Sequence, residues 1–224
     1  MITIMHKIQD YQNVKDFLKS YKPKEEKKEK SKKKNQKIYT IIESGIYKGK
    51  KILLPSLNTT RSTKSIVKSC VFNVLRYSLQ DKIFIEAFGG SALMALEARS
   101  NGCLKSYAIE KDKKAYEVAL KNASSIDKNT ICFNDDTFKK TPQVIQNSKE
   151  NIILYLDPPF DIREGFFDIY EKTLKLIENI QNSNVKIIII EHHSSFKTPD
   201  KIQNYNKTKE KKFGSTSLSF YSLV

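Results

Sequence analysis

The sequence predicts a doubly wound α/β fold, with a mostly parallel sheet, an antiparallel C-terminal hairpin and a small β-hairpin module in front. Two observations predict it. After Asp81, short apolar runs typical of strands alternate with helical runs, and such alternation makes a parallel sheet covered by helices on both faces. The last two strand-like runs flank "FGST" and lie too close together for a crossover helix, so we expect them to pair antiparallel.

Residues 1–37 are predicted to form a basic, largely flexible N-terminal extension. They contain twelve lysines and five acidic residues, and the segment "KPKEEKKEKSKKKNQK" has too little apolar surface to fold alone. Residues 38–60 contain two β runs around Gly45 and Gly49 and are predicted to be the hairpin module. Residues 61–224 would then form the main domain.

A helix is predicted over "RSTKSIVKSCVFNVLRYSL", directly after the hairpin module. Its apolar face would consist of Ile66, Val67, Cys70, Val71, Val74 and Leu75, and its exposed positions would include Lys64 and Lys68. The later strands are predicted at "KIFIEAF", "SYAIE", "TICFND", "NIILYLD" and "VKIIIIEHH", with helices over 91–102, 113–123, from 136 towards 147, and 166–180.

The composition is strongly basic, with 40 Lys and Arg against 25 Asp and Glu and a net charge of +15. This balance favours a polyanionic partner, and nucleic acid before membrane; simple solvation of the lysines is the alternative. The three cysteines fit neither a disulfide framework nor a zinc-binding spacing. No run is typical of a signal peptide or a membrane span, so we expect a cytoplasmic protein with no membrane partner.

Four consecutive strand ends carry residues suited to ligand binding, and ligands of such sheets bind at the carboxyl ends of the strands. The first ends in "EAFGGSALMALEA", where Gly89 and Gly90 permit a sharp turn and the helix opening near Ser91 would present free N–H groups. This is not a GxGxxG pattern, because Ala92 and Ala95 stand at the later positions. Taken alone, the loop is explained equally well by tight strand–helix packing.

The next three strand ends are acidic. Glu110 follows Gly90 at a spacing that suits a carboxylate binding the hydroxyls of a ribose, although an ordinary charged strand end fits as well. Asp136 is placed to accept a hydrogen bond from the amino group of an adenine, and Asp135 is the neighbouring candidate. Capping of the next helix is the alternative for either residue. The fourth strand ends in "DPPF", Asp157 to Phe160, where the two prolines must end the strand.

Several of these motifs together resemble the RsmD family of 16S ribosomal RNA guanine-N2 methyltransferases. They are "FGGSALMALEA", "IEKD", "LDPPF", "KKFGSTSLSFY", the upstream "SGIYKGKKILLP" and "TRSTKSIVKSCVFNVL", and the likeness spans roughly residues 38–224. It implies a Rossmann-like class I methyltransferase fold that uses S-adenosyl-L-methionine. Three positions depart from the family pattern, which usually has Asp at Glu86, Gly at Ala92 and Pro at Ser62.

The resemblance also assigns roles to residues. It implies that the methionine part of the cofactor is surrounded by Glu86, Phe88, Gly89, Gly90 and Ser91, with Glu110 on the ribose and Asp136 on the adenine edge. The target base would be held by the catalytic residues Asp157, Pro158, Pro159 and Phe160. RNA phosphates would be bound by Lys48, Lys50, Lys51, Arg61, Lys64 and Lys68.

Alternatives remain open at this point. The DPPF turn does not identify the ring, so N6-adenine methylation of DNA or RNA is a second reading. A catalytically silent rRNA-binding assembly protein, which has lost cofactor affinity through Ala92, is a third. His192 and His193 fit polar strand-end residues better than metal ligands, and we expect no metal site. We expect a monomer whose partner is small-subunit ribosomal RNA or an assembled small-subunit particle.

Overall fold

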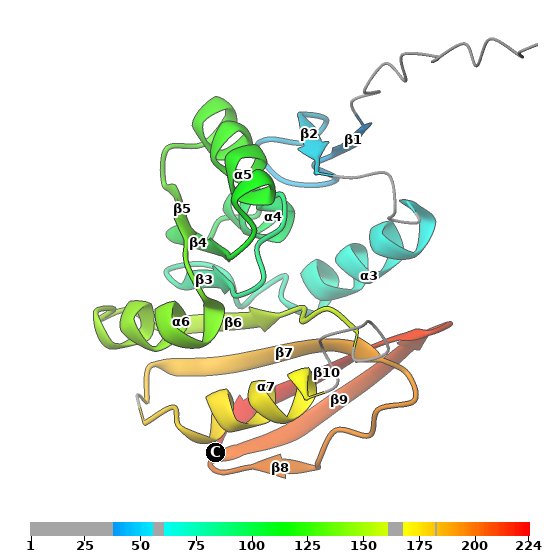
Figure 1. The fold of residues 1–224 in the computed structure, drawn as a ribbon, viewed down its shortest axis with the longest axis vertical. Coiled ribbons are helices and arrows are strands. Elements are labelled where there is room, and N and C mark those ends of the chain that lie inside the picture. Colours follow the sequence, from blue (N-terminus) through cyan, green and yellow to red (C-terminus); the bar gives the residue numbers. More distant parts are fainter. Residues whose placement is uncertain (1–37, 56–60, 161–167, 182) are drawn as a thin grey trace, which may run out of the picture. The chain divides into compact units, whose positions relative to one another are not determined.

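The structure is a computed structural model that describes residues 38–55, 61–160, 168–181 and 183–224, with the backbone alone for residues 61–64 (Figure 1). The chain divides into two units, residues 1–36 and 37–224, and the described residues all belong to the second. The predicted extension, residues 1–37, lies outside the described residues. The predicted hairpin module and main domain fall within one unit.

The predicted hairpin is present as a separate two-stranded sheet. Strands β1 (Ile38–Ile41) and β2 (Lys51–Leu54) pair antiparallel, with Ile38 opposite Leu54 and Ile41 opposite Lys51. The loop that connects the two strands contacts helix α4 (Leu93–Ser100). There the Ile46 amide donates to the Ser100 carbonyl at 2.9 Å, and the Tyr47 amide donates to the Ser100 hydroxyl at 2.9 Å. The loop is therefore attached to the main domain.

An eight-stranded sheet forms the centre of the described unit, in the order β5-β4-β3-β6-β7-β10-β9-β8. The first five strands in that order run parallel, and β7, β10, β9 and β8 pair antiparallel, which confirms the predicted mixed architecture. The strands are β3 (Ile83–Glu86), β4 (Lys105–Glu110), β5 (Thr130–Asn134), β6 (Ile152–Leu156), β7 (Val185–His193), β8 (Lys201–Ile202), β9 (Tyr205–Phe213) and β10 (Thr216–Leu223). The short strand β8 was not predicted.

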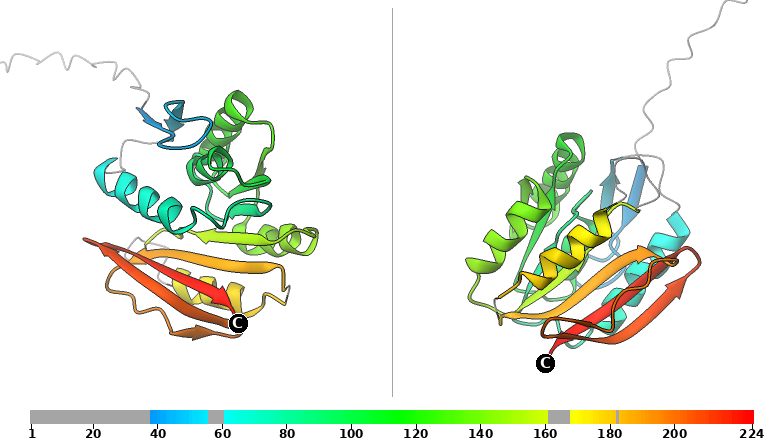
Figure 2. Two further views of the ribbon diagram at one scale, coloured as in Figure 1. Left: turned by 180° about the vertical axis from the view of Figure 1, so that it is seen from behind. Right: turned by 60° about the horizontal axis from the view of Figure 1, so that its bottom comes forward.

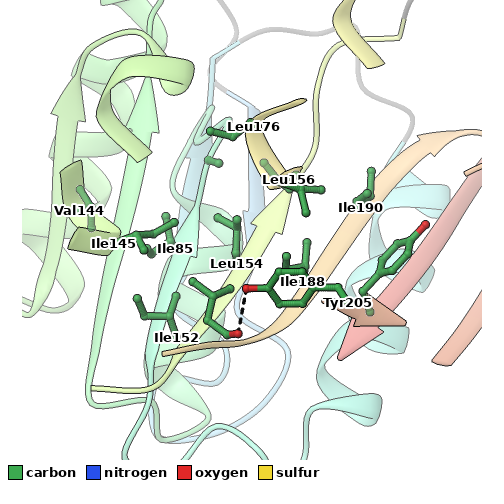
Figure 3. Close-up of a cluster of buried hydrophobic side chains, with 14 of the residues drawn as sticks. Ile85, Val144, Ile145, Ile152, Leu154, Leu156, Leu176, Ile188, Ile190 and Tyr205 are labelled. Atoms are coloured by element: carbon green, nitrogen blue, oxygen red, sulfur yellow. Dashed lines mark hydrogen bonds between the residues drawn. The ribbon is translucent and has the colours of Figure 1, made fainter. Parts of the chain in front are cut away.

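Helices cover both faces of this sheet (Figure 2). On one face, α3 (Arg61–Val74) and α4 pack with Phe84, Ile153 and Ile189 of the central strands, and α5 (Lys113–Ile126) lies over Ala108. On the other face, α6 (Thr137–Gln146) and α7 (Ile169–Glu178) pack on Ile85, Leu154 and Ile188 (Figure 3). The central strands are apolar on both sides, as strands buried on both faces require.

Helix α3 differs from its prediction in which residues it buries. Val67, Val71 and Leu75 are buried as expected, but Ile66 is 55% exposed and Val74 is 36% exposed. Lys68, predicted to be exposed, is buried with 2% of its side chain accessible. The physical reason is a carboxylate partner on α4, described below.

Candidate active site at the strand ends

The predicted site residues follow neighbouring parallel strands of the sheet. Glu86 ends β3, Glu110 ends β4, and Asp157 comes directly after β6. In the register of the sheet, Glu86 pairs with both Ala108 of β4 and Tyr155 of β6, so these strands end close together. The structure therefore brings the glycine loop, Glu110 and the DPPF turn to the same edge of the sheet.

The glycine loop after β3 is hydrogen-bonded to the end of β4. The Gly90 amide donates to one Glu110 carboxylate oxygen at 2.8 Å, and the Asp112 amide donates to the other at 2.7 Å. The Gly89 amide donates to the Ile109 carbonyl at 2.7 Å. A Cβ at Gly89 would lie 3.1 Å from Ala108 Cβ, so this glycine allows the close approach of the loop to β4.

Gly90 has the properties expected where a ligand approaches the backbone. Its φ is +49°, a conformation that glycine adopts far more readily than other residues, and a Cβ there would meet nothing within 4 Å. The backbone of the loop thus borders open space beside the Glu110 carboxylate. A carboxylate retains acceptor capacity after two hydrogen bonds, so these residues fit a ligand that offers hydroxyl groups.

Glu86 caps the start of α4, whose backbone N–H groups were expected to be free. Its buried carboxylate accepts hydrogen bonds from the amides of Met94 (3.3 Å) and Ala95 (2.9 Å). These are N–H groups of the first turn of α4, which we expected to be free for a ligand. That expectation was wrong, because an acid at N-terminal helix amides satisfies them internally. Glu86 therefore holds the loop in place.

Ala92, where the family usually has glycine, adopts left-handed backbone angles of φ 60° and ψ 28°. It is fully buried and packs in the apolar cluster that also contains Ile42, Ile52 and Leu96. Its methyl group is therefore directed into the protein core beneath the hairpin. The alanine accepts a conformation that costs an L-residue roughly 1–2 kcal/mol.

The alternatives for Asp136 are partly resolved. Its carboxylate accepts from the Phe138 amide at 2.9 Å and so caps α6, and it pairs with Lys111 Nζ at 2.9 Å. Burial opposes its ionisation, but the bonds from Lys111 and Phe138 prevail and hold the pKa of Asp136 below its ordinary value. The neighbouring Asp135 accepts from the Asp136 amide at 2.7 Å. The adenine role of Asp136 stays a prediction.

The DPPF turn lies between β6 and the end of β7. Asp157 is half-buried and Pro158 is buried, while the Phe160 ring meets the His193 ring edge-on at 5.4 Å between centroids. Below the turn, the Tyr155 hydroxyl donates to the buried Glu191 carboxylate. Burial, followed by the charges of Glu191 and Asp157, raises the pKa of Tyr155 well above its ordinary value, so the hydroxyl stays protonated. A buried polar contact thus joins β6, the strand that leads into the turn, to β7.

The predicted phosphate-binding residues separate into three groups. Lys48, Lys50 and Lys51 are exposed on the hairpin, with Lys50 Nζ 4.8 Å from the Tyr47 ring centroid. The side chains of Arg61 and Lys64 lie outside the described residues. Lys68 is not available to RNA, because its ammonium is buried 3.3 Å from Glu97 and 3.3 Å from Glu43 and donates to the Ile41 carbonyl at 2.8 Å.

Sequence reasoning missed two residues that attach the hairpin. Buried Glu97 accepts from the amides of Glu43 (2.9 Å) and Ser44 (3.1 Å) as well as from Lys68. Buried Asn122 bonds both backbone groups of Leu53 in the hairpin and the Ser91 carbonyl in the glycine loop, at 2.9–3.0 Å. A glutamate inside the otherwise apolar "SALMALEA" was the available signal, since a buried charge needs a partner.

Within the described residues, no group of three or more His, Cys, Asp and Glu side chains is placed to hold a metal ion. None of the described helices is both long enough and apolar enough to cross a membrane. His192 is instead hydrogen-bonded internally, to the His193 carbonyl and the Ser219 hydroxyl.

Comparison with known proteins identifies the family of the chain. Residues 40–222 match the model of a family described as "Conserved hypothetical protein 95". Ribosomal RNA small subunit methyltransferase D of Haemophilus influenzae is 30% identical over 190 residues, covering 80% of this chain and 92% of the relative. The protein of the same name from Escherichia coli is 26% identical over 182 residues, covering 80% and 88%.

Solved structures give the same result. A structure described as "Putative methyltransferase yhhF from Escherichia coli" has a TM-score of 0.65 at 25% identity, over 83% of this chain and 98% of that one. A methyltransferase-fold structure complexed with SAH shares the fold, with a TM-score of 0.62 at 12% identity over 84% of this chain and 56% of that one. The fold is that of class I methyltransferases. The chain belongs to the matched family, the RsmD family of methyltransferases.

Proposed function

We propose that this protein methylates the exocyclic N2 amino group of a guanine in 16S ribosomal RNA, with S-adenosyl-L-methionine as the methyl donor. The family target would be guanine 966. The observation that carries the proposal is the meeting of three features at one sheet edge: the glycine loop, the Glu110 carboxylate and the DPPF turn. The relatives named ribosomal RNA small subunit methyltransferase D support the RNA class of the substrate.

The donor contributes an electrophilic methyl group carried on a sulfonium. Glu110 would accept hydrogen bonds from the ribose hydroxyls, and the open space beside Gly90 would let the ligand approach the backbone. Phe88, Gly89 and Ser91 would complete the loop around the methionine part, while Glu86 would act through the loop by capping α4. Asp136, which caps α6, would bind the adenine edge.

The target amino group is a poor nucleophile because its lone pair is delocalised into the ring. Asp157 and the Pro158 carbonyl accept its two N–H bonds, which orient the nitrogen and stabilise the positive charge that develops on it. Pro159 makes the turn rigid, and Phe160 provides a ring on which the base stacks. The surplus proton leaves the methylated nitrogen for Asp157 or water. The base has to be unstacked to reach this turn.

The position of Ala92 argues against the alternative of a catalytically silent protein that has lost cofactor affinity. Its methyl group is fully buried in the apolar cluster below the loop, so it does not fill the space on the open side of Gly90. This supports retention of cofactor binding. N6-adenine methylation has no observation of its own in its favour, since the DPPF turn accepts either amino group.

The test is methyl transfer from labelled S-adenosyl-L-methionine to small ribosomal subunits, and to their protein-free RNA, from a strain that lacks this gene. The RNA is then digested and its nucleosides are identified by mass. We expect labelled N2-methylguanosine. Labelled N6-methyladenosine would replace the guanine assignment with the adenine one, and no transfer together with no binding at millimolar cofactor would favour the silent protein.

A further inference from the structure

Strand β9, with the sequence "YNKTKEKKF", holds lysines that differ sharply in their surroundings. Lys207 is largely buried and fully occupied: its ammonium lies 3.2 Å from Asp200 and 3.3 Å from Glu210 and donates to the Thr198 carbonyl at 2.8 Å. Lys209 and Lys211 are exposed, and neither forms an ion pair within the described residues. Their charges are therefore available to a partner.

A β-bulge decides which face these two lysines occupy. Lys207 lies opposite Tyr221 of β10, but Lys209 lies opposite Phe220, so Thr208 is an extra residue between them. Lys211 then lies opposite Leu218. Phe220 and Leu218 belong to the apolar cluster under α3, whereas Tyr221 packs on the α6 and α7 side. The bulge thus moves Lys209 and Lys211 to the α3 face, away from Glu210 and Lys207.

Helix α3 lies beside this part of β9, as both views in Figure 2 show. Cys70 of α3 interacts electrostatically with both lysines. Burial raises the pKa of its thiol above the ordinary value, while the charges of Lys211 and Lys209 lower it. The two exposed lysines therefore lie beside α3, and we call them the β9 lysine face (Lys209 and Lys211).

Strand β9, which carries the β9 lysine face, ends at the same edge of the sheet as the DPPF turn. Strand β9 ends at Phe213, and after the turn Thr216 of β10 pairs with His193 of β7. The Ser194 amide donates to the Ser215 carbonyl at 2.8 Å, which fastens the β9–β10 turn beside the end of β7. The His193 ring in turn contacts Phe160. The lysines thus lie on a strand whose end borders the candidate active site.

We propose that the β9 lysine face binds the phosphate backbone of the substrate RNA and so holds the strand whose target base enters the DPPF turn. This inference rests on the proposed function for the identity of the RNA. An unpaired ammonium is a compact positive charge that suits phosphate oxygens, and the net charge of +15 favours the same polyanion. A separate basic group, formed by Lys48, Lys50 and Lys51, lies on the β1–β2 hairpin, which is not part of the eight-stranded sheet that contains β9.

The test compares two double variants that each remove two positive charges. Lys209→Gln/Lys211→Gln changes the β9 lysine face, and Lys149→Gln/Lys175→Gln changes two exposed lysines outside it, in the loop after α6 and on α7. Affinity for protein-free small-subunit ribosomal RNA is measured from low to high salt. For the first variant we expect a salt slope smaller by about 1.4, roughly tenfold weaker binding at physiological salt, and unchanged cofactor affinity. The control should keep the wild-type slope.

Kinetics separate this inference from the proposed function. If the protein methylates RNA, the β9 variant should raise KM for RNA with little change in kcat. Equal RNA affinity and salt slope in the two double variants would overturn the inference even where methylation is intact. A loss confined to assembled subunits, with protein-free RNA bound normally, would also overturn it and indicate a protein partner. Wild-type protein that binds RNA through these lysines but transfers no methyl group would refute the proposed function alone.

Discussion

The backbone amide of Gly90 and the carboxylate of Glu110 are joined by a hydrogen bond of 2.8 Å. This bond connects the loop after β3 to the end of β4, two strands that are neighbours in the sheet. The second oxygen of Glu110 accepts from the Asp112 amide at 2.7 Å, so the carboxylate is held from two sides. A carboxylate fixed in this way can bind a ligand without first being ordered, which lowers the entropic cost of binding.

Replacing Glu110 should therefore weaken cofactor binding first. Glu110→Ala removes both the ribose acceptor and the bond that fixes the glycine loop, and hydrogen bonds to a charged group contribute about 1.5–3 kcal/mol. We expect S-adenosyl-L-methionine affinity to fall by roughly 10- to 150-fold in calorimetric titration. Glu117→Ala, an exposed glutamate on α5, is the matched control. Affinity of the Glu110 variant within twofold of wild type would contradict the assigned role.

The attachment of the hairpin loop can be tested at two glycines with similar backbone angles. Gly45 (φ +79°) and Gly49 (φ +84°) both have a conformation that strains alanine, but a Cβ at Gly45 would lie 1.8 Å from the Ser100 carbonyl oxygen, and one at Gly49 would meet nothing within 4 Å. Gly49→Ala should lower the free energy of unfolding by about 1 kcal/mol. Gly45→Ala should lower it by about 2 kcal/mol more, because the loop loses its hydrogen bonds to α4.

Chemical denaturation of the two variants measures this difference directly. RNA affinity should fall in the Gly45 variant, since the loop that carries Lys48 is displaced, and should be nearly unchanged in the Gly49 variant. Equal unfolding free energies would show that the loop does not depend on its contact with Ser100.

His192 predicts a pH dependence of stability. Burial lowers the pKa of this fully buried side chain below its ordinary value of 6.5. The neutral ring donates from Nδ1 to the His193 carbonyl at 3.0 Å and accepts at Nε2 from Ser219 at 2.9 Å. Because the unfolded chain binds the proton more readily, the stability contributed by neutral His192 is complete above pH 6.5 and is lost as pH falls through the folded-state pKa.

Urea unfolding at pH 7.5 and 5.5 tests this. The wild-type free energy of unfolding should be lower at pH 5.5 than at pH 7.5. In His192→Gln this decrease should be smaller, even if the variant is less stable at both pH values. Parallel pH profiles for the two proteins would mean that His192 is not the group responsible.

Much of this fold could be predicted because its signals are local. The alternation of strands and helices, the glycine loop and the position of the DPPF turn are all visible in short segments. Lys68 could not be placed in this way, because helical periodicity assigns it to a polar stripe and its partner Glu97 lies on another helix. The face occupied by Lys209 depends on a bulge at Thr208, which only the pairing with β10 reveals.

The strand-end acids show the same limit. Asp136 was suited both to a ligand and to a helix cap; its hydrogen bond from the Phe138 amide shows the cap, and the ligand role stays a prediction. Glu86 was assigned to the cofactor by resemblance, and the structure adds its hydrogen bonds from the Met94 and Ala95 amides, which the sequence did not indicate. Residue type and spacing therefore suggested the candidate residues but not the contacts that each one makes within the protein.

Asp157 is the proposed reaction centre. The most direct measurement is therefore methyl transfer by Asp157→Ala and Asp157→Asn at saturating RNA, with cofactor affinity titrated in parallel. We expect transfer to fall by at least about 100-fold in both variants, while cofactor affinity stays within about threefold of wild type. Near-normal turnover in Asp157→Ala would contradict the role of the DPPF turn. A loss of cofactor affinity as large as the loss of transfer would contradict it too.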